Sequence, residues 1–209
     1  LDANDLTRAR MRITLSPGSA QGATGPTVLV TAQPLPEYPP AWYTDGVPVV
    51  VTALVQAVGD PTFGHKTGCY FPRVMARQDA AHKGAEEALW FTADHRLAEA
   101  CFSNVFLVDA DGVVRTPPLG TPVLDGVVRQ AVLELCQRDG VRYDAEAALT
   151  IDDVLAAKEM FLTNSTMGLR PVVRIERHVV GDETPGEVTQ RLMAAYAELL
   201  DTECQHDNR

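Results

Sequence analysis

Cysteine is scarce in this sequence, and the few cysteines show no metal-binding spacing. They stand at positions 69, 101, 136 and 204 without a Cys-x-x-Cys pair, so neither a zinc ribbon nor a dithiol redox motif is indicated. The five histidines also lack the i, i+4 spacing of a zinc-binding helix. We expect a protein of the reducing cytoplasm with no metal site.

Long apolar runs and clusters of positive charge are missing as well. No stretch approaches the ~20 apolar residues of a transmembrane helix, and the first residues show no signal-peptide pattern. The chain carries 28 acidic and 18 basic side chains, a formal net charge of -10, which disfavours nucleic acid as a partner. The patterns GxGxxG, GxxxxGK[ST] and GxSxG are absent. These absences favour a small-molecule partner over nucleic acid or membrane.

The first part of the chain has the pattern of short strands. With 209 residues, 45% of them hydrophobic, the chain can bury a substantial core as one large domain or two small ones. Residues 9–15 and 26–32 are rich in β-branched side chains and flank a Gly/Ser loop, which predicts paired strands. A proline-rich connection over 33–45 and a strand over 47–52 follow. We place a domain boundary near residue 58, dividing the chain into 1–58 and 59–209.

The second part alternates strands and helices and predicts an α+β fold. A helix is expected to begin beside Lys66 and to end at Gly84, and another covers 126–138 with an i, i+3, i+4, i+7 apolar stripe. Thr150, with Asp153 three residues later, is expected to open a short helix. The last helix is expected over 185–200, and strands are expected at 87–91, 97–100, 104–108, 113–115, 160–163 and 172–176.

Two residues of this part have side chains suited to cofactor chemistry. Lys66 offers an amine that could form a Schiff base if it lies in a pocket. Glu99 lies inside a predicted strand, where a buried carboxylate needs a cationic or hydrogen-bonding partner. Local context by itself favours a solvated lysine at position 66, and an ordinary solvated glutamate in a strand is equally compatible with the pattern at position 99.

Three separated blocks of sequence decide between these interpretations. They are KTGCYFPRVMARQDA, beginning at Lys66, then AEACFSNVFLV followed by RTPPLGTPVLDGVVRQAV, and finally EMFLTNSTMGLRPVV. The stretch that contains them resembles the class IV aminotransferases, the fold-type IV pyridoxal phosphate enzymes. This family includes branched-chain and D-amino-acid transaminases and 4-amino-4-deoxychorismate lyase. The resemblance implies a small N-terminal α/β domain, incomplete here, and a larger β-rich domain with flanking helices.

The resemblance also assigns roles around the cofactor. Lys66 matches the catalytic Schiff-base lysine, and Glu99 matches the carboxylate that keeps the pyridine nitrogen protonated, with Asn104 the asparagine that follows it. Leu124 matches the leucine that packs on the cofactor ring.

The cofactor phosphate is expected where a helix begins. Val127 and Val128 open the helix expected over 126–138, where free backbone N–H groups attract anions. Ser165 is implied as a further phosphate ligand, while Thr166 and Met167 are implied to face an amino substrate. The resemblance further implies a homodimer.

The sequence departs from the family pattern at several points. Family members carry further N-terminal residues, including an arginine that clamps the phosphate, and we expect a preceding segment to supply it. A threonine usually stands in place of Val128. Branched-chain transaminases place a tyrosine five positions after the lysine, where this chain has Phe71 with Tyr70 one step earlier. The segment Ser16-Pro17-Gly18 lacks the arginine of the D-amino-acid enzymes.

These comparisons of motifs predict a pyridoxal-phosphate-dependent enzyme. The segment from Thr163 to Val172 looks most like that of 4-amino-4-deoxychorismate lyases, which release pyruvate and form 4-aminobenzoate. An amino-acid transaminase of D-amino-acid or branched-chain type is the alternative. A non-catalytic relative is a third, favoured by the missing clamp and by Val128.

Overall fold

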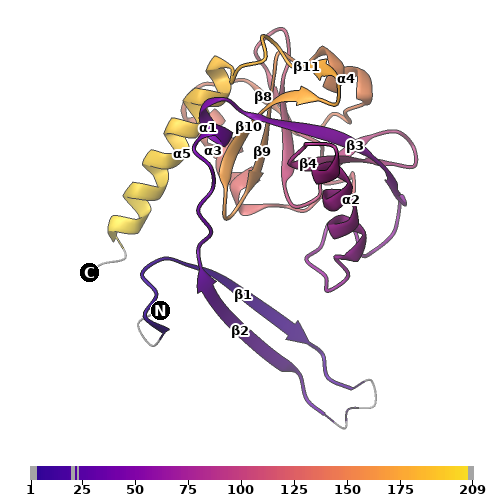
Figure 1. The fold of residues 1–209 in the computed structure, drawn as a ribbon, viewed down its shortest axis with the longest axis vertical. Coiled ribbons are helices and arrows are strands. Elements are labelled where there is room, and N and C mark those ends of the chain that lie inside the picture. The colour runs from indigo at the N-terminus through magenta and orange to yellow at the C-terminus, as the bar shows by residue number, and fades with distance from the viewer. Residues whose placement is uncertain (1–3, 20–21, 23, 207–209) are drawn as a thin grey trace. The chain divides into compact units, whose positions relative to one another are not determined.

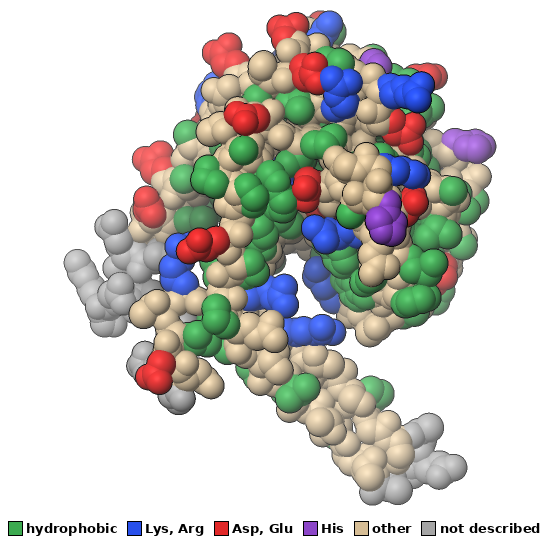
Figure 2. Space-filling model, in the orientation of Figure 1, with side chains coloured by type: hydrophobic (Ala, Val, Ile, Leu, Met, Phe, Trp, Pro, Cys, Tyr) green, Lys and Arg blue, Asp and Glu red, His purple; other side chains and the backbone are tan. Residues whose placement is uncertain are grey.

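The computed structural model describes residues 4–19, 22 and 24–206. The chain divides into two compact units, Leu1–Tyr38 and Pro39–Arg209. The first unit contains a hairpin of β1 (Ala9–Ser16) and β2 (Thr27–Pro34), paired antiparallel with Ala9 opposite Pro34. Hydrophobic side chains are exposed on both of its strands (Figure 2), among them those of Met11, Ile13, Leu15, Val28, Leu29 and Val30.

The second unit is built on a nine-stranded mixed sheet (Figure 1). Its strands are β3 (Val47–Gln56), β4 (Glu87–Thr92), β5 (Leu97–Ala100), β6 (Asn104–Val108), β7 (Val114–Arg115), β8 (Tyr143–Asp144), β9 (Glu159–Asn164), β10 (Gly168–Ile175) and β11 (His178–Val179). The strand order is β5-β4-β3-β10-β9-β6-β7-β8, and β11 pairs with β10. Strand β3 runs parallel to both of its neighbours, whereas β9 and β10 form an antiparallel hairpin.

Helices cover the sheet because its strands are apolar on both faces. They are α1 (Ala41–Thr44), α2 (Phe71–His82), α3 (Val127–Arg138), α4 (Ile151–Ala156) and α5 (Glu187–His206). Along β6, Val105 and Leu107 belong to one core cluster, and Phe106 and Val108 belong to another, as the period of two along a strand requires. The first cluster includes residues of α4, the second includes residues of α3 and α5, and a third joins α2 to β4.

The short helix α4 begins as the sequence predicts. The backbone N–H of Thr150 donates to Asp153 Oδ2 at 2.8 Å, and its hydroxyl lies 3.0 Å from the same oxygen. The pattern of threonine followed three residues later by an acid therefore forms a capping box.

The structure corrects several expected boundaries. Helix α2 begins at Phe71 rather than beside Lys66, because Pro72 suits the first turn of a helix. Strand β10 begins at Gly168 rather than at 172, since its first residues pair with β9. The proline-rich connection contains the short helix α1, whose N-cap is Pro40.

The division of the chain also differs from the expected one at residue 58. Strand β3 lies between β4 and β10 in the sheet, so residues 47–56 belong to the larger unit and the division lies at Tyr38. None of the helices in the described part of the chain is both long enough and apolar enough to cross a membrane.

Candidate functional site

A cavity of about 240 Å³ opens in the second unit where α2, β5, β6, β9 and α3 meet. Six of the residues that the sequence marks for the cofactor line it: Lys66, Glu99, Leu124, Val127, Val128 and Ser165. Thr166 and Met167, marked for the substrate, are not among its lining residues. Segments up to a hundred residues apart in the chain thus meet at one site.

Lys66 reaches the cavity from the irregular segment before α2. It is exposed, and its neighbour His65 also lines the cavity. Gly64, with a φ of 77°, allows a close backbone approach, because a Cβ there would lie 3.1 Å from the carbonyl oxygen of Val123. The backbone at Gly64 therefore passes close to that of Val123, in the loop that contains Leu124.

Glu99 lies on β5 with 5% of its surface exposed. The backbone N–H of Leu124 donates to its Oε2 at 3.1 Å. Its Oε1 pairs with the guanidinium of Arg73, a residue in the first turn of α2. The buried carboxylate therefore has the cationic partner that its burial requires.

Asn104 fixes the loop that leads into α3. Its Nδ2 donates to the carbonyl oxygen of Leu124 at 2.7 Å. A Cβ at Gly126, the N-cap of α3, would lie 2.2 Å from Asn104 Oδ1, so a larger residue there would displace the Asn104 side chain. Val127 is exposed and Val128 is buried, so neither side chain adds a polar group here. The backbone N–H groups of the first helical turn and the carboxylate of Asp125 are polar groups at this end of the cavity.

Asn164 organises the turn between β9 and β10. Its Oδ1 accepts hydrogen bonds from the backbone N–H groups of Thr166, at 3.0 Å, and Met167, at 2.9 Å. The hydroxyl of Tyr43 donates to the carbonyl oxygen of Met167 at 3.0 Å. Ser165 is exposed at the tip of this turn and lines the cavity.

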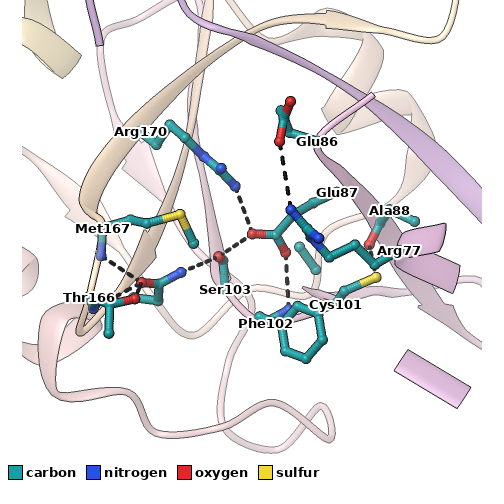
Figure 3. A network of polar contacts seen from close by, with 12 residues as sticks. Arg77, Glu86, Glu87, Ala88, Cys101, Phe102, Ser103, Thr166, Met167 and Arg170 are labelled. Carbon is teal, nitrogen blue, oxygen red and sulfur yellow. Dashed lines mark hydrogen bonds and ion pairs between the residues drawn. The ribbon is translucent and has the colours of Figure 1, made fainter. Parts of the chain in front are cut away.

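A buried ion pair connects this turn to the loop that follows Glu99 (Figure 3). Arg170 Nη2 donates to Glu87 Oε1 at 2.7 Å, with both side chains at most 2% exposed. Ser103 Oγ donates to the same carboxylate oxygen at 2.6 Å and accepts from Asn164 Nδ2 at 3.1 Å. The network thereby joins β4, the residue 101–103 loop and the β9–β10 turn.

Arg73, Tyr70 and Thr163 also line the cavity, although the sequence assigned none of them a role at the cofactor. Arg73 lies three and seven residues before Ala76 and Ala80, the buried residues of α2. This spacing places all three on one face of the helix, so the sequence did contain a signal that Arg73 faces the protein interior. Thr163 is 1% exposed. The alternation of side chains along a strand shows that it faces inward, but not whether it packs in the core or lines a cavity.

The cavity wall also includes the buried residues Thr163 and Cys101, which carry a hydroxyl and a thiol group. Among the described residues, Thr163 Oγ1 is buried and has no hydrogen-bond partner. Burial raises the pKa of the Cys101 thiol, which keeps the thiol protonated near neutral pH and unsuited as a nucleophile.

Tyr70 also changes the comparison of motifs. Its ring stacks on Phe102 with centroids 6.0 Å apart, and it lines the cavity, whereas the Phe71 side chain is 71% exposed. A tyrosine is therefore present at the cavity although it stands one position early in the sequence.

Comparisons with known proteins find related sequences. The model of the family described as amino-transferase class IV matches residues 1–175. The D-alanine aminotransferase of Bacillus licheniformis is 36% identical over 122 residues, covering 58% of this chain and 42% of that protein. The branched-chain-amino-acid aminotransferase of Pseudomonas aeruginosa is 31% identical over 139 residues, covering 66% of this chain and 44% of that protein. The chain thus spans less than half the length of these two relatives.

Solved structures share the fold. A branched-chain amino acid aminotransferase of T.th., solved with pyridoxamine 5'-phosphate, superposes with a TM-score of 0.78 at 25% identity, covering 86% of this chain and 58% of that chain. A proposed 4-amino-4-deoxychorismate lyase from Legionella pneumophila superposes with a TM-score of 0.82 at 20% identity, covering 94% and 72%. The mixed sheet with its flanking helices is therefore of the fold-type IV kind that the sequence predicts.

Proposed function

Since this chain belongs to the class IV aminotransferase family, we propose that it contains the cofactor site of a pyridoxal-phosphate-dependent amino-acid aminotransferase. The observation that carries the proposal is the cavity that brings Lys66, Glu99 and the first turn of α3 together. Each of the three supplies a different chemical group: an amine, a buried carboxylate, and unpaired backbone N–H groups.

The cavity walls fit the cofactor's polar groups. The free N–H groups at the start of α3 and the hydroxyl of Ser165 suit a phosphate. Glu99 offers an acceptor for a ring nitrogen. Leu124 supplies an apolar contact for the ring.

When bound, pyridoxal phosphate would supply an electron-accepting ring conjugated to the substrate. Lys66 would hold the cofactor and then move a proton at the substrate α-carbon, serving first as a base and then as an acid. Glu99 would accept the ring N–H and so hold the ring in its protonated state. Thr166 and Met167 remain proposed substrate contacts, although they lie outside the cavity wall.

Absorption spectroscopy tests cofactor binding directly. We expect the protein with pyridoxal phosphate to show a visible absorption band that Lys66→Ala abolishes. Lys83→Ala is the matched control, because Lys83 lies at the end of α2 and pairs on the surface with Asp79. A wild-type protein without the band, or a band that persists in Lys66→Ala, would contradict the proposal and favour a non-catalytic relative.

The reaction is tested with a panel of L- and D-amino acids and 2-oxoglutarate or pyruvate. We expect a new amino acid to form, at a rate that Lys66→Ala lowers by at least about a hundredfold. The similarity to aminotransferases that act on branched-chain amino acids and D-alanine guides the panel. If no pair of substrates reacts, the transaminase proposal fails.

A lyase reaction is the second candidate. The observation that favours it is the Thr163–Val172 segment, which resembles that of the 4-amino-4-deoxychorismate lyases. Under this proposal, the protein would release pyruvate from aminodeoxychorismate and form 4-aminobenzoate. Coupled detection of pyruvate decides between the two reactions, because a transaminase would leave this substrate intact.

We also propose that the protein forms a homodimer, as the family resemblance implies. Light scattering coupled to size-exclusion chromatography would measure the mass of the particle. A monomeric particle that carries out the reaction would contradict this part of the proposal.

A further inference from the structure

Arg73 lies on the cavity wall in a place that the helix itself does not favour. It stands in the first turn of α2, after the N-cap Tyr70. A cation near a helix N-terminus opposes the helix dipole, so the stability of α2 does not explain an arginine here. Its contacts outside the helix must supply the reason.

Those contacts hold the guanidinium from several sides. Nη1 donates to the carbonyl oxygens of Ala100, at 3.0 Å, and Cys101, at 3.2 Å. Nη2 pairs with Glu99 Oε1. The Gln56 amide is oriented so that its nitrogen donates to the carbonyl oxygen of Pro122, and its oxygen then accepts a hydrogen bond from Arg73 Nη2 at 3.1 Å. The guanidinium also lies 5.6 Å from the ring centroid of Trp90. Because the Arg73 side chain is only 15% exposed, these contacts fix its position.

The fixed guanidinium determines how Glu99 faces the cavity. The Glu99 side chain is 7% exposed, and its two oxygens are bound separately, Oε1 by Arg73 and Oε2 by the N–H of Leu124 at 3.1 Å. An ionised carboxylate has about four acceptor positions, so about two stay free for a molecule in the cavity. The two internal contacts set the plane in which those positions lie.

Arg73 also places a positive charge beside Glu99. A buried carboxyl group without a partner favours its neutral form, whereas a cation and an N–H donor favour the anion. The other charged or ionisable groups of the cavity wall are those of His65, Lys66, Tyr70, Cys101 and Asp125, and among the described residues none of these side chains has a hydrogen bond or ion pair with Glu99. The guanidinium is therefore the group that compensates this carboxylate.

We propose that Arg73 is a positioning residue that holds Glu99 as an oriented anion, so that a proton shared between Glu99 and the cofactor's ring nitrogen stays on the nitrogen. This inference rests on the proposed function, because it assigns the ring nitrogen to Glu99. Without the arginine, the carboxyl group would take up the shared proton, and the ring would lose its positive charge and part of its electron-accepting power.

The ¹⁵N chemical shift of ring-labelled pyridoxal phosphate bound to the protein reports where that proton lies. We expect the signal of a protonated ring nitrogen in the wild type and in Arg73→Lys, which keeps the charge. In Arg73→Gln, which keeps a hydrogen-bond donor and loses the charge, the signal should shift toward the unprotonated value. Arg77→Gln is the matched control, since Arg77 lies one turn later on α2, 46% exposed, and pairs with Glu86.

A second measurement needs no cofactor. In a double-mutant cycle of Arg73→Gln and Glu99→Gln, unfolding should show a coupling of about tenfold or more in the folding equilibrium constant. Arg77→Gln with Glu99→Gln should show none. Additivity of the Arg73 and Glu99 variants would overturn the inference.

The outcomes separate this inference from the proposed function. If the wild type has no Lys66-dependent visible band, the proposed function fails and the inference fails with it. If the band is present and Arg73→Gln keeps the protonated ring signal, only the inference fails.

Discussion

At the scale of single residues, the burial of charge separates structural pairs from surface pairs. Glu87 and Arg170 are 1% and 2% exposed and 2.7 Å apart, whereas the neighbouring pair of Glu86 and Arg77 is 3.8 Å apart and partly exposed. Trp42 also stacks on the guanidinium of Arg170, with 4.9 Å from its carbon to the ring centroid. These differences predict very different costs of removing one carboxylate.

We expect Glu87→Gln to lower the free energy of unfolding by about 3–5 kcal/mol, because it leaves the Arg170 charge buried without its partner. Glu86→Gln, the adjacent control, should cost about 0–1 kcal/mol. Urea unfolding followed by fluorescence measures both. Equal costs for the two variants would contradict the importance of this buried pair.

The cysteines provide a second prediction for single residues. Burial raises the pKa of Cys136 to about 11, and a thiol is ionised only above its pKa, so about one Cys136 in a thousand is thiolate at pH 8. Cys69 is exposed. Alkylation by iodoacetamide at pH 8 followed by peptide mapping should label Cys69 and leave Cys136 unlabelled until the protein is denatured. Equal labelling in the folded protein would show that Cys136 is accessible.

At the scale of elements, a residue from one element often completes the end of another. Glu159 at the start of β9 accepts hydrogen bonds from the N–H groups of Val188, at 3.1 Å, and Thr189, at 2.7 Å, at the beginning of α5. A Cβ on Gly186 would lie 2.0 Å from the Glu159 side chain, so this glycine leaves room for the carboxylate. The α5 helix thus takes its N-terminal cap from the sheet.

We expect Glu159→Ala to lower the free energy of unfolding by about 1–2 kcal/mol, since it removes both a cap and a favourable charge at the helix N-terminus. Glu187→Ala, within the first turn of α5, removes a similar charge without the capping bonds and should cost less. Thermal unfolding compares the two variants. A larger loss in Glu187→Ala would contradict the capping role of Glu159.

At the scale of the whole molecule, the two units differ in what they contain. All residues that line the cavity and all three hydrophobic core clusters belong to the unit Pro39–Arg209. The unit Leu1–Tyr38 contains the exposed β1–β2 hairpin, and an isolated hairpin is at best marginally stable in water. The cooperative stability of the chain is therefore expected to come from the larger unit.

We expect a protein of residues 39–209 to unfold cooperatively, with a denaturation midpoint close to that of the full chain. Its folding would be measured by circular dichroism and by urea unfolding beside the full chain. Loss of the cooperative transition in the shorter protein would show that residues 1–38 are needed to stabilise the larger unit.

The sequence by itself determined most elements and the family to which the chain belongs. Periodicity predicted α3 and α5 and most strands of the sheet, because apolar residues repeat with the period of the element that buries them. The motifs around Lys66, Glu99 and Ser165 predicted the family, and the cavity contains all three. Boundaries were less predictable, as the start of α2 shows, since local turn and proline geometry decided them.

Only the tertiary structure decided which side chains are partners. Arg73 pairs with Glu99, Arg170 with Glu87, and Asn104 fixes the Leu124 loop, and these pairs come from different elements. Local patterns report which face of an element is buried, whereas ion pairs depend on how distant elements are brought together. The amine and the carboxylate are thus fixed by sequence, and the cation that orients the carboxylate is fixed by the fold.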